Sequence, residues 1–297
     1  MDIKKIFEKK PSTKSAVRRY TRTKFGNFML FVILTAAGLF STLPLIFCVC
    51  TSFKPLDELL IFPPTFFVKR PTIGNYTVLP DLMASLKVPF SRYLFNSLFT
   101  SIVSTFVYIF VSTMAAFVLS KATFKGRNTL FWVVQFSLMF NAYTLAVPQY
   151  LIFSKMGIID TYWIYILPQM ASTLGVFLAK QYIEGYIPDA LLEAAKIDGA
   201  SAYRVYWSIV MPIIKPIWLT ITLFAFRDIW AMVPNGKIFS EQLKILPQVV
   251  TQITAGGTAR AGSSMAVTVI MMIPPILVYL ISQSNVAEAM SSAGIKE

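Results

Sequence analysis

The sequence contains no histidine, and only two of its 297 residues are cysteine. Histidine is the commonest metal ligand and the side chain that most readily exchanges a proton near neutral pH. Cys48 and Cys50 lie inside an apolar run and are too few for a zinc or iron–sulfur site. We therefore expect no metal and no cofactor bound in this chain, and the composition excludes a soluble metalloenzyme.

Charged residues are also scarce, at 14% of the chain, whereas 56% of the residues are hydrophobic and the mean hydropathy is +0.63. A soluble domain has roughly a quarter of its residues charged. This composition is typical of a membrane protein. The net charge of +13 would suit a nucleic-acid partner, but lysine and arginine also gather at the cytoplasmic ends of membrane spans.

The first membrane span follows a basic segment. Residues 1–27 carry nine lysines or arginines and two acids, and no charge occurs in the 23 residues from Phe28 to Cys50. At ~1.5 Å per residue this run can cross the ~30 Å hydrocarbon core of a bilayer. It is too long for the apolar core of a cleaved signal peptide. The basic flank predicts a cytoplasmic N-terminus.

Further long apolar runs complete six predicted spans and occupy residues 94–120, 130–153, 162–183, 213–233 and 264–282. An even number of spans returns the C-terminus to the cytoplasm. The segments predicted inside hold 17 of the 27 cations, so the charge follows orientation and we expect no nucleic-acid partner. Runs of this length are not barrel strands of ~10 residues. The fold class is therefore an all-α membrane protein with six transmembrane helices.

The predicted organisation has three parts and three notable loops. The parts are a basic cytoplasmic segment (1–27), a six-span membrane domain (28–283) and a cytoplasmic tail (284–297). The loops are two outer ones, about 51–93 and 234–262, and a cytoplasmic one between spans four and five, at 184–212.

The cytoplasmic loop 184–212 has the local signals of two short helices. Pro188 suits the first position of a helix, and Asp189 places negative charge at its positive end. Gly199 can adopt a positive φ and end that helix, and Ser201 can cap the next one. We expect a helix–turn–helix at the membrane surface that presents fixed charges and small residues.

The same loop resembles a known signature. It is similar to the EAA motif of ABC-importer permease subunits. The matching positions are Glu193-Ala194-Ala195, then Gly199 after three residues, Ile209 after nine more, and Met211-Pro212 after one more. Met211 stands where the motif has leucine. Residues 62–76, 91–105, 121–128 and 147–163 resemble carbohydrate permeases of the maltose-transporter type. The likeness covers most of residues 25–230, and the end of the fifth span and the tail depart from it.

The resemblance implies a function and a set of partners. The EAA loop would form a coupling helix that docks on an ATP-hydrolysing subunit. The residues expected to carry the coupling are Glu193, Ala194, Ala195, Asp198, Gly199 and Pro212. The expected partners are a homologous second permease subunit, two ATPase subunits that bind ATP and magnesium, an external solute-binding protein and the lipid bilayer of a bacterial inner membrane. The chain has no phosphate-binding G-x-x-x-x-G-K-[ST] motif and would not be an enzyme.

Five polar or aromatic residues are candidates for the substrate path: Asn141, Tyr143, Arg227, Asp228 and Trp230. Charges in or near spans are often functional, and an aromatic ring beside hydrogen-bonding groups suits a sugar. The alternatives are a local ion pair with tryptophan as a membrane anchor, and hydrogen bonds between helices.

The expected cargo is a carbohydrate, in particular an oligosaccharide, and two other functions stay open. The chain could serve an importer of a non-sugar solute, or it could be an ion-coupled carrier that works alone. The lack of histidine and of paired intramembrane carboxylates disfavours the carrier, and also an intramembrane hydrolase. Transport that proceeds without ATP would indicate the carrier.

Overall fold

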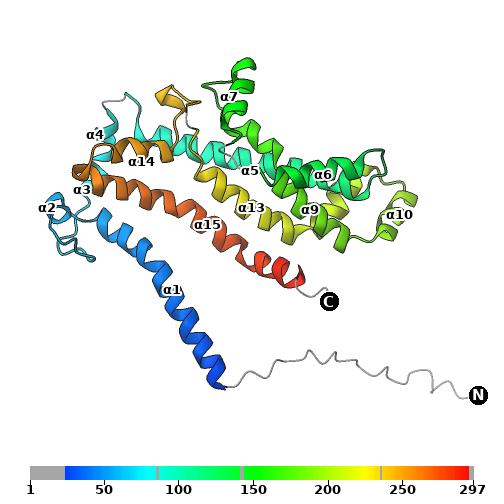
Figure 1. The fold of residues 1–297 in the computed structure, drawn as a ribbon, viewed down its shortest axis with the longest axis horizontal. Helices are drawn as coiled ribbons and strands as arrows, with labels where there is room; N and C mark the ends of the chain where they lie inside the picture. Colours follow the sequence, from blue (N-terminus) through cyan, green and yellow to red (C-terminus); the bar gives the residue numbers. More distant parts are fainter. Residues whose placement is uncertain (1–23, 85–86, 141–143, 235, 294–297) are drawn as a thin grey trace, which may run out of the picture. The chain divides into compact units, whose positions relative to one another are not determined.

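The computed structural model describes residues 24–84, 87–140, 144–234 and 236–293. These residues form helices, turns and loops, and no strand occurs among them (Figure 1). The helices are α1 (Lys24–Ser52), α2 (Leu56–Leu59), α3 (Gly74–Thr77), α4 (Leu79–Ala84), α5 (Phe90–Lys121), α6 (Arg127–Ser137), α7 (Ala146–Lys155), α8 (Trp163–Ile166), the 3-10 helix η2 (Leu167–Ala171), α9 (Thr173–Tyr186), α10 (Asp189–Ile197), α11 (Ala202–Val205), the π-helical η3 (Tyr206–Val210), α12 (Met211–Ile213), α13 (Lys215–Trp230), the 3-10 helix η4 (Glu241–Leu243), α14 (Leu246–Thr254), the 3-10 helix η5 (Thr258–Arg260) and α15 (Ala261–Ala293).

The chain divides into two units, Met1–Phe47 and Cys48–Glu297. In the first unit the described residues belong to α1, which is apolar and exposed along most of its length. The second unit contains the other helices and all of the core described below.

Three described helices are long and apolar enough to cross a membrane: Lys24–Ser52, Phe90–Lys121 and Thr258–Gln283. The pair Ala202–Ile213 and Lys215–Trp230 meets the same test together, but it is bent by 81° and counts as a fourth span only if the two helices act as one. The all-helical architecture is therefore as predicted, and the structure supports three to four of the six predicted spans by length and composition.

The other two predicted spans are interrupted helices. Residues 130–153 are divided between α6 and α7, and residues 162–183 run through α8, η2 and α9. Pro168 lies in η2, where its missing N–H and its ring disfavour a regular α-helix. Hydropathy over a window records apolar length and does not detect such breaks.

α5 packs against the elements on both sides of it through a stripe of small, mostly polar residues. Its buried members recur every three or four positions and include Asn96, Ser97, Thr100, Ser101, Ser104, Thr105, Ser112, Thr113 and Ala116. Ser104 Oγ donates to the Tyr165 carbonyl at 3.1 Å. Small side chains let helix backbones approach closely, which is how helices associate within lipid.

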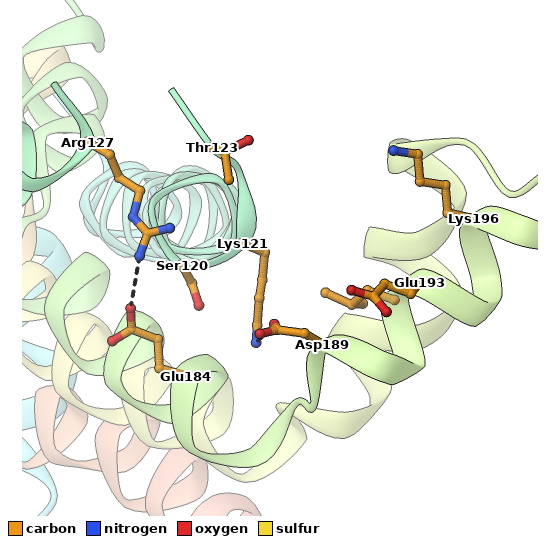
Figure 2. A pocket seen from close by; sticks show the side chains of 9 residues that line it. Ser120, Lys121, Thr123, Arg127, Glu184, Asp189, Glu193 and Lys196 are labelled. Carbon is orange, nitrogen blue, oxygen red and sulfur yellow. Dashed lines mark hydrogen bonds and ion pairs between the residues drawn. The ribbon is translucent and has the colours of Figure 1, made fainter. Parts of the chain in front are cut away.

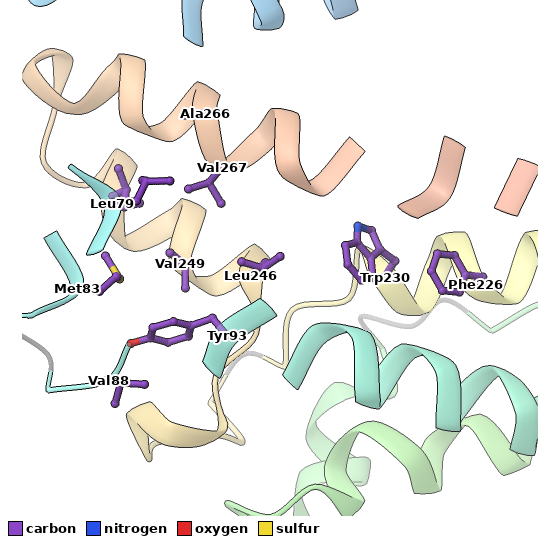
Figure 3. Packing of buried hydrophobic residues seen from close by; sticks show 11 residues of the cluster. Leu79, Met83, Val88, Tyr93, Phe226, Trp230, Leu246, Val249, Ala266 and Val267 are labelled. Carbon is purple, nitrogen blue, oxygen red and sulfur yellow. The ribbon is translucent and has the colours of Figure 1, made fainter. Parts of the chain in front are cut away.

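Two of the three hydrophobic clusters among the described residues lie at different ends of the second unit. One joins α4, α5, α13, α14 and α15 and contains Leu79, Met83, Val88, Tyr93, Phe226, Trp230, Leu246, Val249, Ile253, Ala266 and Val267 (Figure 3). The other joins the end of α5 to the region from α9 to α13 and contains Ala116, Ala179, Ile183, Ile187, Ala195, Val205, Tyr206, Val210, Ile214, Ile217 and Ile221.

The segment 51–93 is organised by a buried carboxylate. Glu58 is 3% exposed and accepts hydrogen bonds from the backbone N–H groups of Lys69 and Arg70, at 2.9 and 3.3 Å. Burial alone would raise the pKa of Glu58, but these hydrogen bonds and the nearby cations Lys54 and Arg70 lower it below its ordinary value. The predicted outer loop is thus a folded element with its own polar core.

The segment 234–262 is held against α5 by side chains that bond to its backbone. Asn96, which is fully buried, donates to the carbonyls of Gln242 at 2.8 Å and Lys244 at 2.9 Å. Ser97 Oγ accepts the N–H of Leu246 at 2.7 Å. These bonds satisfy backbone groups that the bend into α14 leaves without helical partners.

Candidate coupling site

The loop 184–212 forms the predicted helix–turn–helix. α10 spans Asp189–Ile197, with Pro188 just before it, so the helix begins one residue later than predicted. Gly199 has φ of +79°. The Gly199 N–H donates to the Lys196 carbonyl at 3.1 Å, and the Ala200 N–H donates to the Ala195 carbonyl at 3.0 Å. This pair of bonds is the Schellman pattern of helix ends. The prediction that Gly199 ends this helix is confirmed.

The second predicted cap is also confirmed. Ser201 Oγ accepts the N–H of Arg204 at 3.3 Å at the start of α11. The helix then loosens into the π-helical turn η3 before α12, which contains Pro212. The chain bends by 81° before α13, and the indole of Trp218 donates to the Met211 carbonyl at 3.2 Å. The bend takes a helical N–H donor away from this carbonyl, and the indole N–H supplies a hydrogen bond in its place.

The two faces of α10 differ sharply in burial. Glu193, Ala194, Lys196 and Asp198 are exposed. Ala195 is 8% exposed and belongs to the cluster that joins α5, α9 and α13. Of the two adjacent alanines, only Ala194 is available to a partner protein in this conformation, while Ala195 fixes the helix to the bundle.

The exposed face of the coupling hairpin also carries large apolar side chains that the motif does not include. Ile197 at the end of α10 is 86% exposed, and Tyr203 on α11 is 66% exposed. Single exposed apolar side chains are common on protein surfaces, so these two residues add apolar area to the exposed face without identifying a partner. The signal available in the sequence was the position of Ile197, three residues after Ala194 on the same helix.

A polar cavity of about 530 Å³ lies between α10 and the ends of α5, α6 and α9 (Figure 2). Lys121, at the end of α5, points toward Asp189. Its ammonium donates to Asp189 Oδ1 and to the Ile187 carbonyl, both at 2.6 Å. Arg127 lies 3.9 Å from Glu184 on the same side of the cavity. These contacts connect the loop 121–128 to the end of α9 and the start of α10.

The charge of Lys121 acts on the helix start. Its hydrogen bond and its positive charge hold the pKa of Asp189 below the ordinary value for aspartate. The Asp189 side chain is 79% exposed, so water screens this attraction, whereas Lys121 is only 10% exposed. The bond from Lys121 to the Ile187 carbonyl is shielded better. Lys121 therefore serves chiefly to position the turn before α10.

The three described residues that were predicted for the substrate path do not form one cluster. Arg227 and Asp228 pair with each other, with nitrogen–oxygen distances of 2.9 and 3.0 Å, and both side chains are exposed. Trp230 is 4% exposed, stacks on Phe226 and donates its indole N–H to the Met271 carbonyl at 2.9 Å (Figure 3). The structure gives Trp230 a packing position between α13 and α15, away from any exposed surface.

The other two predictions for the substrate path, Asn141 and Tyr143, lie outside the described residues. In the sequence they fall between α6 and α7.

Comparison with known proteins identifies relatives along most of the chain, although no family model matches it. Protein LplC of Bacillus subtilis is 30% identical over 289 residues, which cover 89% of this chain and 92% of that protein. The inner membrane ABC transporter permease protein YcjP of Escherichia coli is 28% identical over 95% of this chain and 99% of its own length.

A solved structure has a similar fold. It is the crystal structure of a bacterial ABC transporter involved in the import of the acidic polysaccharide alginate. The likeness has a TM-score of 0.71 and covers 89% of this chain and 98% of the matched chain, at 21% sequence identity. The fold described above is therefore found in a known membrane transporter.

Proposed function

Because the chain belongs to the family of carbohydrate ABC-transporter permeases, we propose that it forms half of the translocation pathway of an ATP-driven importer. A homologous permease subunit forms the other half, and two ATPase subunits bind and hydrolyse ATP with magnesium. An external solute-binding protein delivers the cargo, an oligosaccharide. The chain itself catalyses no covalent step and alternates between inward-open and outward-open states.

The observation that carries this proposal is the geometry of α10. Its exposed face offers a small residue, Ala194, between the charged Glu193 and the apolar Ile197. A small side chain allows close approach, a carboxylate sets the register and an apolar side chain supplies buried area. Its other face is anchored through Ala195 in the core. A helix that is free on one face and fixed on the other can transmit a push from a partner to the bundle.

The coupling residues divide into two roles in this proposal. Glu193, Ala194 and Asp198 contact the ATPase subunit directly. Ala195 and Gly199 hold the shape of the hairpin, through core packing and a positive φ. Pro212 lies beside the bend into α13, where it helps to define the change of direction between the hairpin and the fifth span.

The proposed topology has six spans in a bacterial inner membrane, with both termini in the cytoplasm. The basic residues of 1–27 and of the loop 121–128 support this orientation. The interrupted spans fit a transporter, because irregular backbone at membrane depth is tolerated where it is buried in protein or lines a polar cavity.

The proposed substrate path includes Arg227, Asp228, Asn141 and Tyr143. The exposed pair Arg227–Asp228 supports it, since these charges lie at the end of α13 next to an apolar groove between α13 and α15. A charged pair is stable beside lipid only at an interface or a wet cavity. The second permease subunit would cover this groove.

The decisive experiment reverses one charge on α10. In the assembled importer, reconstituted with its ATPase subunits and binding protein, Glu193→Lys should abolish ATP-dependent uptake and leave membrane insertion unchanged. A matched control is Asp81→Lys, which reverses an exposed charge on α4 in a predicted outer loop and should retain uptake. Normal uptake by Glu193→Lys contradicts the coupling role, and uptake without ATP contradicts the importer.

A further inference from the structure

A second cavity, of about 540 Å³, lies away from α10. It is lined by residues of α7, α8 and η2 and by the segment that follows α13, including Gln149, Tyr150, Ile164, Pro168 and Lys237. Its size is within the ~300–1,000 Å³ range of small-molecule sites. The lining combines apolar walls with a few polar groups, as such sites do.

Lys237 is the charged group of this cavity and is half-buried. Its ammonium donates to Gln149 Oε1 and lies 5.6 Å from the centre of the Phe153 ring. No carboxylate lies within ion-pair distance of it among the residues that the structure describes. Burial lowers the pKa of Lys237, because its charge is removed from water without an opposite charge beside it.

The backbone around Lys237 is fixed by Asp160. The Asp160 N–H donates to the Lys237 carbonyl at 3.0 Å, and Asp160 Oδ1 accepts the N–H groups of Phe239 and Ser240, both at 2.9 Å. Asp160 has φ of +59°, a left-handed conformation that aspartate tolerates. Its carboxylate is thereby occupied by backbone donors, and the ammonium of Lys237 is held at the cavity in a defined place.

We propose that this cavity binds an acidic sugar unit, with the sugar carboxylate paired to the ammonium of Lys237. An ammonium has three N–H donors, and Gln149 accepts one of them. The amide of Gln149 and the phenol of Tyr150 suit sugar hydroxyls, and the ring of Tyr150 and the walls at Ile164 and Pro168 suit the apolar face of a pyranose.

This inference rests on the proposed function and adds a substrate class to it. Lys237 lies in the predicted outer segment 234–262, and Gln149 lies near the outer end of the third predicted span. The cavity is therefore on the side from which a binding protein delivers its cargo. A negatively charged saccharide that reaches it would supply the opposite charge that Lys237 lacks within the described part of the chain.

The test compares two trisaccharides of the same size. Full-length chain in phosphatidylcholine nanodiscs at pH 7 is titrated with trigalacturonate and with neutral galactotriose. The wild type should bind trigalacturonate at least about tenfold more tightly, the effect of one charge-assisted hydrogen-bonded contact. Lys237→Met should lose this preference, and Lys237→Arg should keep most of it. The matched control is Lys155→Met, which removes an exposed lysine from the same α7 region.

Three outcomes overturn the proposal. In the first, the wild type binds both trisaccharides equally, and in the second, Lys237→Met and Lys155→Met have the same effect on binding. In the third, trigalacturonate does not bind and phosphatidylglycerol added to the nanodiscs binds in a Lys237-dependent manner, which assigns the cavity to a lipid headgroup. The experiment needs no ATPase partner, so its failure is distinct from normal uptake by the Glu193→Lys importer, which contradicts the proposed function.

Discussion

The hairpin of residues 184–212 and the predicted outer segment 234–262 are both short stretches between longer helices, but their backbones are stabilised in different ways. The hairpin is defined by local bonds, such as the glycine turn after α10 and the serine cap of α11, and presents an exposed face. The outer segment is tied by residues about 150 positions away, such as Asn96. The turns of the hairpin are thus closed by bonds within the segment itself, whereas the backbone of the outer segment takes its donors from α5.

The largest effect that separates the two regions should follow from Asn96→Ala. The substitution removes the donor to the Lys244 carbonyl and leaves the Gln242 carbonyl with the longer contact from Arg92 Nε, at 3.4 Å. The loss of the buried Asn96 amide should cost about 3 kcal/mol of local stability. Hydrogen exchange of the amides in 241–254 should accelerate, while α10 is unaffected.

The control for this substitution is Asn128→Ala, which truncates an exposed asparagine on α6. If exchange in α10 rises as much as in 241–254, the two regions are not independent and the comparison fails.

A substitution at the turn after α10 should have an intermediate effect, confined to the hairpin. Gly199→Val places a β-branched residue at φ of +79° and should cost about 2 kcal/mol. Uptake by the assembled importer should fall several-fold, with exchange in 241–254 unchanged.

Gly199→Asn provides the graded control, because asparagine adopts positive φ more readily than valine. It should retain most of the uptake. Equal loss in the two variants would show that the space beside the turn, and not its backbone conformation, matters.

The smallest effect should be a pH dependence of the outer segment. Burial opposes ionisation of Glu241, but hydrogen bonds from Lys244, Tyr93 and Gln252 lower its pKa below 4.5. A carboxylate with a lowered pKa adds stability above its unfolded pKa and loses it as the pH falls through the folded value. Protection of α14 against hydrogen exchange should therefore decline below about pH 4.5.

Glu241→Gln should remove this pH dependence, and the coupling helix should not share it, since Asp189 is exposed and screened. A decline of the same size in the glutamine variant would assign the effect to another carboxylate, with Glu58 the next candidate because it is buried.

The sequence by itself determined the features that depend on neighbours within a few positions. The start and end of α10 and the cap of α11 followed from proline, glycine and serine, whose backbone preferences act over one turn of helix. The all-helical membrane class followed from apolar length and charge, because a bilayer demands both.

Only the tertiary structure decided which side chains are buried, which are exposed and which residues they contact. Ala194 and Ala195 are identical residues one position apart, yet one is exposed and the other is in the core, since packing against α5 and α9 selects the face. Trp230, which was predicted for the substrate path, packs between α13 and α15. Lys237 became notable only when folding placed it at a cavity, with no carboxylate of the described residues within ion-pair distance. Burial and pairing depend on contacts between distant segments, which local sequence does not encode.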